Sequence, residues 1–118
     1  NRADTSGSYT SNANPKAKLM LISSSGWTQI ELALANGPGD MTNSWPRWAP
    51  TSGGTGWLAW SSKRDYGHTT SARAQLWVSE IDFSVASSGA DASKPPVWLP
   101  GQLTSAGNHT PTWLPRFN

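Results

Sequence analysis

The sequence predicts an all-β domain made of short antiparallel strands joined by long loops. Turn-forming Gly, Pro, Ser, Thr and Asn recur throughout the 118 residues, and charged residues make up 14% of them, against about 25% in an average soluble domain. The eight tryptophans stand mostly in apolar runs too short for ordinary helices. Breaks rich in glycine and proline separate these runs, which is typical of a β-protein.

The first strands are expected after a polar lead-in. Residues 1–16 offer almost nothing to a hydrophobic core, so we expect a flexible segment or loop there. Apolar runs follow at 17–24 and 27–35, and the tight turn Ser25-Gly26 between them predicts a hairpin. A short helix ending at Gly37 is the alternative for the end of the second run. The side of this run expected to be buried comprises Thr28, Ile30, Leu32 and Leu34.

Further strands are expected in the second half of the chain. SWPRWAP at 44–50 predicts a short strand broken at its ends, because proline has no N–H to donate a hydrogen bond to a neighbouring strand. TGWLAWSS at 55–62 predicts a buried strand, and AQLWVSEIDF at 74–83 alternates as a strand does. A loop of small residues is expected at 84–93, before the proline-rich KPPVWLP at 94–100.

The sequence contains two internal repeats. NSWPRWAP at 43–50 and NHTPTWLP at 108–115 share the pattern Asn-x-x-Pro-x-Trp-x-Pro. In a looser repeat, an apolar run ends in Ser23-Ser24 and another ends in Ser61-Ser62, 38 residues later. This offset is close to the roughly 40–45 residues of one four-stranded propeller blade.

Residues 45–82 resemble the repeat of TolB-like β-propellers, which are similar to WD-repeat propellers. A blade of that family reads P-x-W-S-P-D-G-x-x-I-A-F-S-S-x-R-D-G and continues into an alternating strand that ends in Asp. The matching residues here are Pro46, Trp48 and Pro50, then Trp57 and Trp60 in the second strand, Arg64, Asp65 and Gly67 in its turn, and Pro111 and Trp113 in the second motif copy. Thr51-Ser52-Gly53-Gly54 replaces the usual Asp-Gly turn.

The resemblance implies that the chain is the C-terminal portion of a β-propeller. It implies part of one blade at 17–35, one complete four-stranded blade at 45–99 and the first strand of the next blade at 111–115. On this interpretation Trp57 and Trp60 are buried between neighbouring blades. Arg64 and Asp65 satisfy the hairpin turn, and a pair between them is one arrangement there.

The chain is too short to form all the blades that a propeller needs. A propeller needs at least four blades of about 40 residues each, and the segments within 17–118 account for less than two. We therefore expect the fold to be completed by the remainder of a longer chain, by another subunit or by copies of this chain.

No motif predicts catalysis, a cofactor or a metal site. The sequence has no cysteine, no nucleophile elbow, no phosphate-binding Gly-Lys-Ser/Thr and no metal-ligand spacing. Its net charge of +2 comes from scattered basic residues, which argues against a nucleic-acid partner. It also lacks an apolar run of about 18 residues, the length that a membrane span needs.

The predicted function is therefore a non-catalytic protein–protein interaction or assembly module, periplasmic or extracellular, as the resemblance to envelope propellers implies. One alternative is carbohydrate binding through exposed tryptophans. Another is an accessory propeller of a peptidase whose catalytic domain lies elsewhere. The candidate binding surface comprises Trp45, Trp98, Tyr66, His68 and His109, and the flanking prolines make Trp45 and Trp98 the best candidates for exposure.

Overall fold

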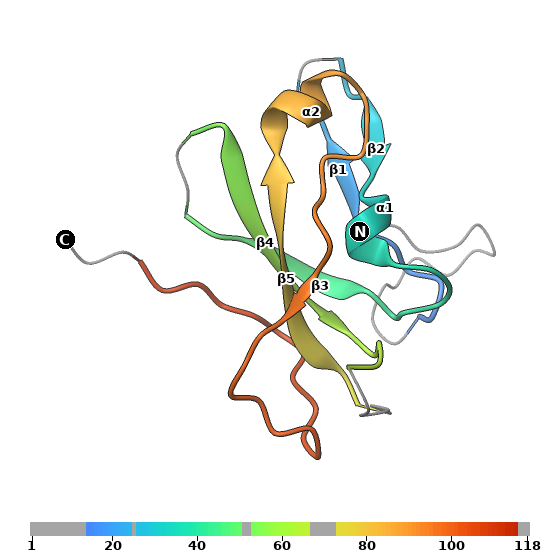
Figure 1. Cartoon of the computed structure of the whole chain (residues 1–118), viewed down its shortest axis with the longest axis vertical. Helices are drawn as coiled ribbons and strands as arrows, with labels where there is room; N and C mark the ends of the chain where they lie inside the picture. The colour runs from blue at the N-terminus through green and yellow to red at the C-terminus, as the bar shows by residue number, and fades with distance from the viewer. Residues whose placement is uncertain (1–13, 25, 51–52, 67–72, 116–118) are drawn as a thin grey trace.

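The computed structural model describes residues 14–24, 26–50, 53–66 and 73–115, which form two antiparallel sheets and two short helices (Figure 1). In chain order the elements are β1 (Met20–Ile22), β2 (Gln29–Glu31), α1 (Ala33–Asn36), β3 (Ser44–Trp48), β4 (Thr55–Ser62), β5 (Gln75–Asp82), α2 (Phe83–Ser87) and β6 (Val97–Trp98). The predicted all-β character is confirmed.

The larger sheet is a four-stranded meander in the order β3-β4-β5-β6. Its central pair, β4 and β5, is in register from Thr55 opposite Asp82 to Ser62 opposite Gln75. The strands predicted at 55–62 and 74–83 are thus confirmed, and the four-stranded sheet extends from Ser44 to Trp98. Two sheets of this size do not by themselves constitute a propeller, so that assignment remains a prediction.

The smaller sheet is the predicted hairpin, but it is shorter than expected. β1 pairs with β2 from Met20 opposite Glu31 to Ile22 opposite Gln29. The chain then leaves the strand conformation and forms α1, which ends at Gly37 with φ of 75°. The helix that the sequence offered as the alternative for residues 33–35 is therefore the one observed.

The helical turn changes which side chains are buried. Ile30 and Leu32 are buried as predicted, whereas Leu34 is 52% exposed because α1 turns it away from the sheet. Thr28 is also exposed, since it lies in the turn before β2 begins.

A second short helix stands where a loop was expected after residue 83. The Asp82 carboxylate accepts hydrogen bonds from the backbone N–H groups of Ser84 (2.9 Å) and Val85 (3.4 Å). An N-cap of this kind starts a helix by satisfying its first free donors. The sequence signal was an aspartate directly before FSVAS.

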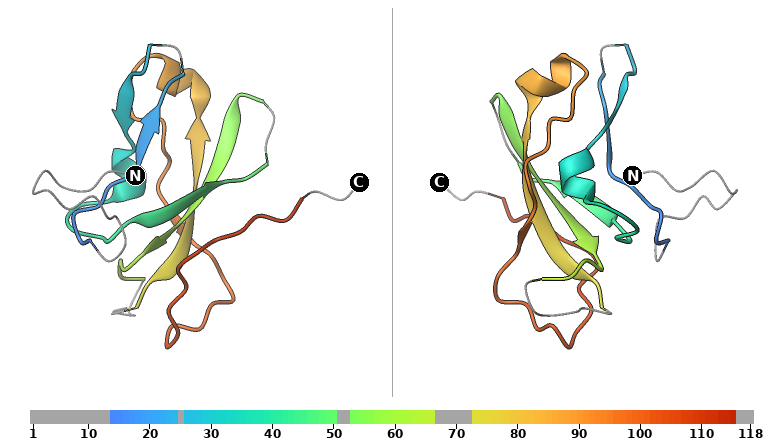
Figure 2. Two further views of the ribbon diagram at one scale, coloured as in Figure 1. Left: turned by 180° about the vertical axis from the view of Figure 1, so that it is seen from behind. Right: turned by 45° about the vertical axis from the view of Figure 1, so that its right-hand side comes forward.

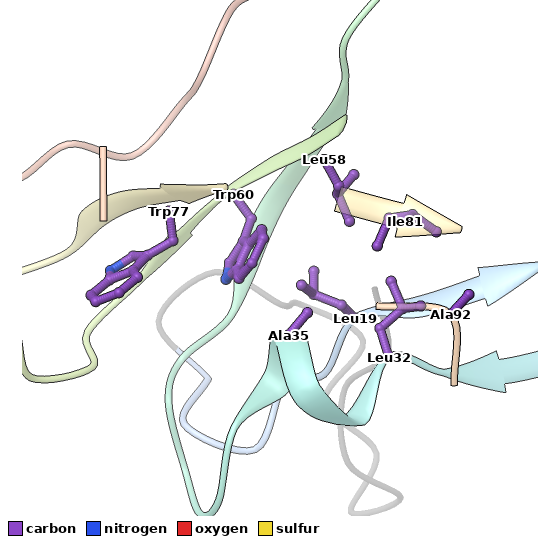
Figure 3. Close-up of a cluster of buried hydrophobic side chains, with 8 residues drawn as sticks. All are labelled: Leu19, Leu32, Ala35, Leu58, Trp60, Trp77, Ile81 and Ala92. Carbon is purple, nitrogen blue, oxygen red and sulfur yellow. The ribbon is translucent and has the colours of Figure 1, made fainter. Parts of the chain in front are cut away.

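The β1–β2 hairpin and α1 form a layer that covers one face of the four-stranded sheet (Figure 2). Neighbouring residues on a strand point to opposite faces, and directly paired residues share a face. We call the covered side the inner face; it carries Leu58, Trp60, Trp77 and Ile81. These side chains meet Leu19, Leu32 and Ala35 from the covering layer, with Ala92 beside them (Figure 3).

The opposite side, which we call the outer face, carries Trp57, Ala59, Val78 and Val97. The burial of Trp57 between neighbouring blades remains a prediction: within this chain its side chain is 42% exposed, whereas Trp60 on the inner face is fully buried. The physical reason is that the covering layer lies on one face only.

The C-terminal segment attaches to both sides of the central strand instead of forming a strand at 111–115. The backbone N–H of Asn108 donates to the Ala74 carbonyl (2.8 Å), next to β5. The Trp113 indole donates to the Arg47 carbonyl (3.0 Å), in β3. Ala59 and Ser61 of β4, between these two attachments, are buried on the outer face. Within the described residues no strand pairs with 111–115, so its place in a further blade remains a prediction.

Replacing Asp82 with alanine is expected to lower the melting temperature at pH 7, because α2 loses its N-cap. Hydrogen bonds, chiefly the one that the Ser84 hydroxyl donates, lower the pKa of Asp82 below its ordinary value. The carboxylate therefore stabilises the fold above its unfolded pKa of about 3.9, and this contribution is lost as the pH falls through the lower folded pKa. Thermal melts of both proteins from pH 7 downward should converge below about pH 4. A difference independent of pH would contradict this role.

Candidate functional site

The centre of the polar core is Asn43, the first residue of the repeated Asn-x-x-Pro-x-Trp-x-Pro motif. Its side-chain oxygen accepts from the Trp60 indole (3.1 Å) and from Arg64 Nη2 (2.9 Å). Its side-chain nitrogen donates to the Asn36 carbonyl (3.1 Å) at the end of α1. Asn43 therefore joins the four-stranded sheet to the covering layer.

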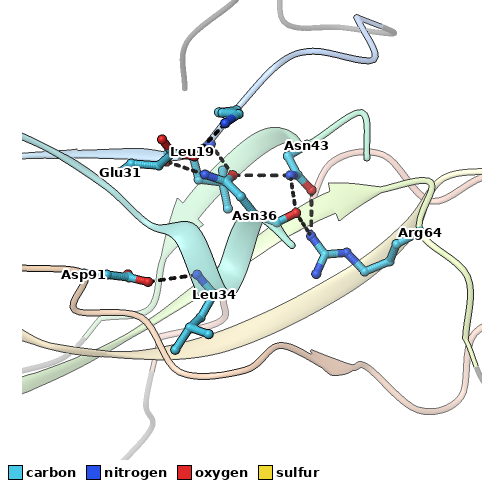
Figure 4. Close-up of polar contacts among 8 residues, drawn as sticks. Leu19, Glu31, Leu34, Asn36, Asn43, Arg64 and Asp91 are labelled. Atoms are coloured by element: carbon cyan, nitrogen blue, oxygen red, sulfur yellow. Dashed lines mark hydrogen bonds and ion pairs between the residues drawn. The ribbon is translucent and has the colours of Figure 1, made fainter. Parts of the chain in front are cut away.

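Asn36 extends these contacts to Leu19, directly before β1 (Figure 4). Its side-chain oxygen accepts from the Leu19 backbone N–H (2.6 Å), and its side-chain nitrogen donates to the Leu19 carbonyl (3.1 Å). An amide that pairs with both backbone groups of a residue replaces a strand partner there. We call Asn36, Asn43, Trp60 and Arg64 the Asn43 network.

Arg64 is the buried cation of this network. Its Nη2 donates to the carbonyls of Ala35 (2.7 Å) and Asn36 (3.1 Å), the last residues of α1. Its guanidinium carbon lies 5.4 Å from the Trp60 ring centroid and 5.2 Å from that of Trp77. Burial lowers the pKa of Arg64 to about 10. This value is still well above neutral pH, so the guanidinium stays charged.

Arg64 is buried instead of lying exposed in the hairpin turn beside Asp65. Arg64 points inward and is 7% exposed, because the orphan carbonyls of α1 and the amide of Asn43 supply its acceptors. Asp65 lies at the surface. The sequence pattern gave no sign that a residue of the strand turn would cap a helix 28 residues earlier.

Tyr66 and Trp98, both predicted binding residues, are brought together at the surface. Their rings stack with centroids 4.7 Å apart and planes 22° apart, and Tyr66 meets Trp77 edge-on at 6.0 Å. Tyr66 is 48% exposed, whereas Trp98 is half-buried. We call Tyr66, Trp77 and Trp98 the aromatic cluster.

A cavity of about 480 Å³ lies beside this cluster. Trp77 and Arg64 line it together with apolar residues from α1 and from the segment before β6. The carboxylates of Asp40 and Asp65 are also in its wall. The cavity therefore offers apolar surface and both signs of charge.

The other predicted binding residues are not part of the aromatic cluster. Trp45 is 38% exposed at an irregularity in the pairing of β3 with β4, with φ of 55°, which is rare for a tryptophan. His109 is exposed in the C-terminal segment. His68 lies outside the described residues.

The residues that carry the family resemblance have mixed environments. Trp48 is 44% exposed and packs against Phe83 with ring centroids 5.7 Å apart. A Cβ on Gly56 would lie 2.7 Å from the Phe83 ring and 3.1 Å from Trp48, so this contact requires glycine. Of the remaining members, Pro111 is buried, Pro46 and Trp113 are half-buried, and Pro50 is exposed.

The described part of the chain contains no group of three or more His, Cys, Asp or Glu side chains placed to hold a metal ion. Among the same residues, no helix has the length and apolar character needed to cross a membrane.

No protein-family model matches this sequence, and no match was found among curated proteins or among solved structures.

Replacing Asn43 with alanine should destabilise the fold by about 2 kcal/mol or more, because each buried donor left without its acceptor costs about 1–3 kcal/mol. The orphaned donors are the Trp60 indole and Arg64 Nη2. Chemical denaturation measures the change.

The matched control is Asn108→Ala, at the same position of the second motif copy. Asn108 is half-buried, and the bond found for it in the described structure is made by its backbone N–H. We expect a change within about 0.5 kcal/mol. Equal losses for the two variants would show that the Asn43 network does not fasten the layers.

Proposed function

We propose that this chain is a protein–protein interaction and assembly module, built as part of a β-propeller and acting in the periplasm or outside the cell. It binds another protein surface through the outer face of its four-stranded sheet. The proposal assigns it no catalytic residue.

The observation that carries this proposal is the exposed apolar character of the outer face. Val97 is 59% exposed and Trp57 42% exposed, although both belong to a sheet whose other face is closed by an apolar layer. Leu99, directly after β6, is 39% exposed. Neighbouring exposed apolar side chains of this size are typical of surfaces that bind protein.

The two ends of the outer face differ in how they are covered. Ala59 and Ser61 are buried where the C-terminal segment attaches, whereas Trp57 lies nearer the other end of β4 and is open. Glu80, directly opposite Trp57, and Arg47, opposite Ala59, supply charges around the patch. An apolar centre with a polar rim is the usual anatomy of a protein interface.

The test is hydroxyl-radical footprinting of the chain in the native complex isolated from its source, compared with the free chain. We expect oxidation of Trp57 to fall several-fold in the complex, because a partner covers the outer face. Tyr66, of similar exposure but outside that face, is the internal reference and should keep its rate. A native species in which Trp57 reacts as fast as in the free chain would rule the proposal out.

Carbohydrate binding is a second candidate, supported by the aromatic cluster. Tyr66 is stacked on Trp98 and half-exposed beside Trp77, which lines the cavity. An aromatic ring held in place in this way presents a flat apolar surface to the C–H groups of a sugar, while nearby carboxylates accept hydrogen bonds from the sugar hydroxyls.

On this second candidate, Tyr66→Ala should weaken binding of a glycan about fivefold or more, since a stacked aromatic contact is worth on the order of 1 kcal/mol. A glycan panel followed by tryptophan fluorescence measures it. Trp57→Lys is the control and should bind as the wild type does. A panel without any fluorescence change eliminates the glycan function.

A further inference from the structure

The chain contains two similar units, each a hairpin followed at once by a short helix. β2 ends at Glu31 and α1 begins at Ala33; β5 ends at Asp82 and α2 begins at Phe83. Ser23-Ser24, directly after β1, and Ser61-Ser62, at the end of β4, are 38 residues apart. The structure therefore stacks one copy of a unit on another.

The alignment of the Ser-Ser pairs matches residues on the first strands. Leu19 corresponds to Trp57, and Ile22 corresponds to Trp60. Leu19 is 1% exposed and Trp57 42%, whereas Ile22 is 55% exposed and Trp60 fully buried. Each unit buries the side that faces the other unit and exposes the side that faces away.

The tryptophan that precedes each helix shows the same reversal. Trp27, two residues before β2 begins, and Trp77, within β5, each lie six residues before the helix that follows, at Ala33 and Phe83. Trp77 is 5% exposed on the inner face, whereas Trp27 is 79% exposed. We call Met20, Ile22 and Trp27 the outer side of the hairpin, because they correspond to the inner face of the sheet.

The two uncovered surfaces are thus the two halves of a contact that the chain already makes once. We infer that the outer face of one chain packs on the outer side of the hairpin of a second copy, repeating the internal contact between the layers. This inference rests on the proposed function and names the partner. The contact is head-to-tail, so it builds a ring if the rotation closes and an open stack if it does not.

The charges on the two surfaces suit this arrangement. Lys18 and Glu31, paired at 2.8 Å, stand on the outer side of the hairpin. Arg47 and Glu80 stand on the outer face of the sheet. Each surface carries charges of both signs, so the contact does not require like charges to be buried together.

A mixing experiment with the purified 118-residue chain tests the head-to-tail contact. Ile22→Glu removes the hairpin surface and Trp57→Glu removes the sheet surface. We expect the wild type to associate as its concentration rises, and each variant alone to associate at least about tenfold more weakly. An equimolar mixture retains one good surface of each kind, so it should form a 1:1 heterodimer that grows no further. Sedimentation velocity and native mass spectrometry measure these species.

Two further variants keep the test interpretable. Leu103→Glu, at a 72% exposed loop position, is the control and should associate as the wild type does. Val97→Glu is a second disruption of the outer face, used if Trp57→Glu fails to give the wild-type circular dichroism spectrum and cooperative melt.

Two outcomes would overturn the inference. If Trp57→Glu prevents association and Ile22→Glu does not, the outer face pairs with itself or with another surface. If the wild type stays monomeric at all concentrations, the partner is not a second copy. In either case protection of Trp57 in the native complex would still support the proposed function, so the two failures are distinguishable.

Discussion

The structure depends on one buried group of hydrogen bonds, in which Arg64 and Asn43 hold the end of α1 against the sheet. A helix of four residues and a hairpin of three-residue strands have little stability of their own. Arg64 satisfies the free carbonyls of α1, and the rings of Trp60 and Trp77 lie on either side of the charge. A cation without such contacts would be too costly to bury.

The strands could be predicted from the sequence because they depend on local patterns. The alternation in 74–83 and the apolar run at 55–62 each favour a strand whatever the rest of the fold is, and both segments form strands. The Asn43 network could not be predicted, since Arg64 finds its acceptors 28 and 29 residues earlier in the chain. The exposure of Trp57 has a related reason: a second layer that would cover the outer face is not among the described residues.

The two motif copies show how similar sequences acquire different roles through their neighbours. Asn43 follows α1 in the chain and is 2% exposed. Its side chain donates to the Asn36 carbonyl, and the Asn36 side chain donates to the Leu19 carbonyl. Asn108 follows β6 and a loop, and it is half-buried. The two motif tryptophans also have different neighbours: Trp48 packs on Phe83, whereas the Trp113 indole donates to the Arg47 carbonyl. A motif of this kind specifies a geometry only when the unit beside it is present.

The attachment of α1 also sets an order of events during synthesis. The backbone N–H groups of Leu34 and Ala35 donate to Asp91 and to Ser93, residues 57 and 58 positions later in the chain. The meander β3-β4-β5 is built from sequence neighbours and closes quickly by comparison. The hairpin layer leaves the ribosome first, yet its sheet and its anchoring loop come later. The hairpin layer is therefore made before the sheet and fixed in place after it, and until then Leu19 and Leu32 need protection from other chains.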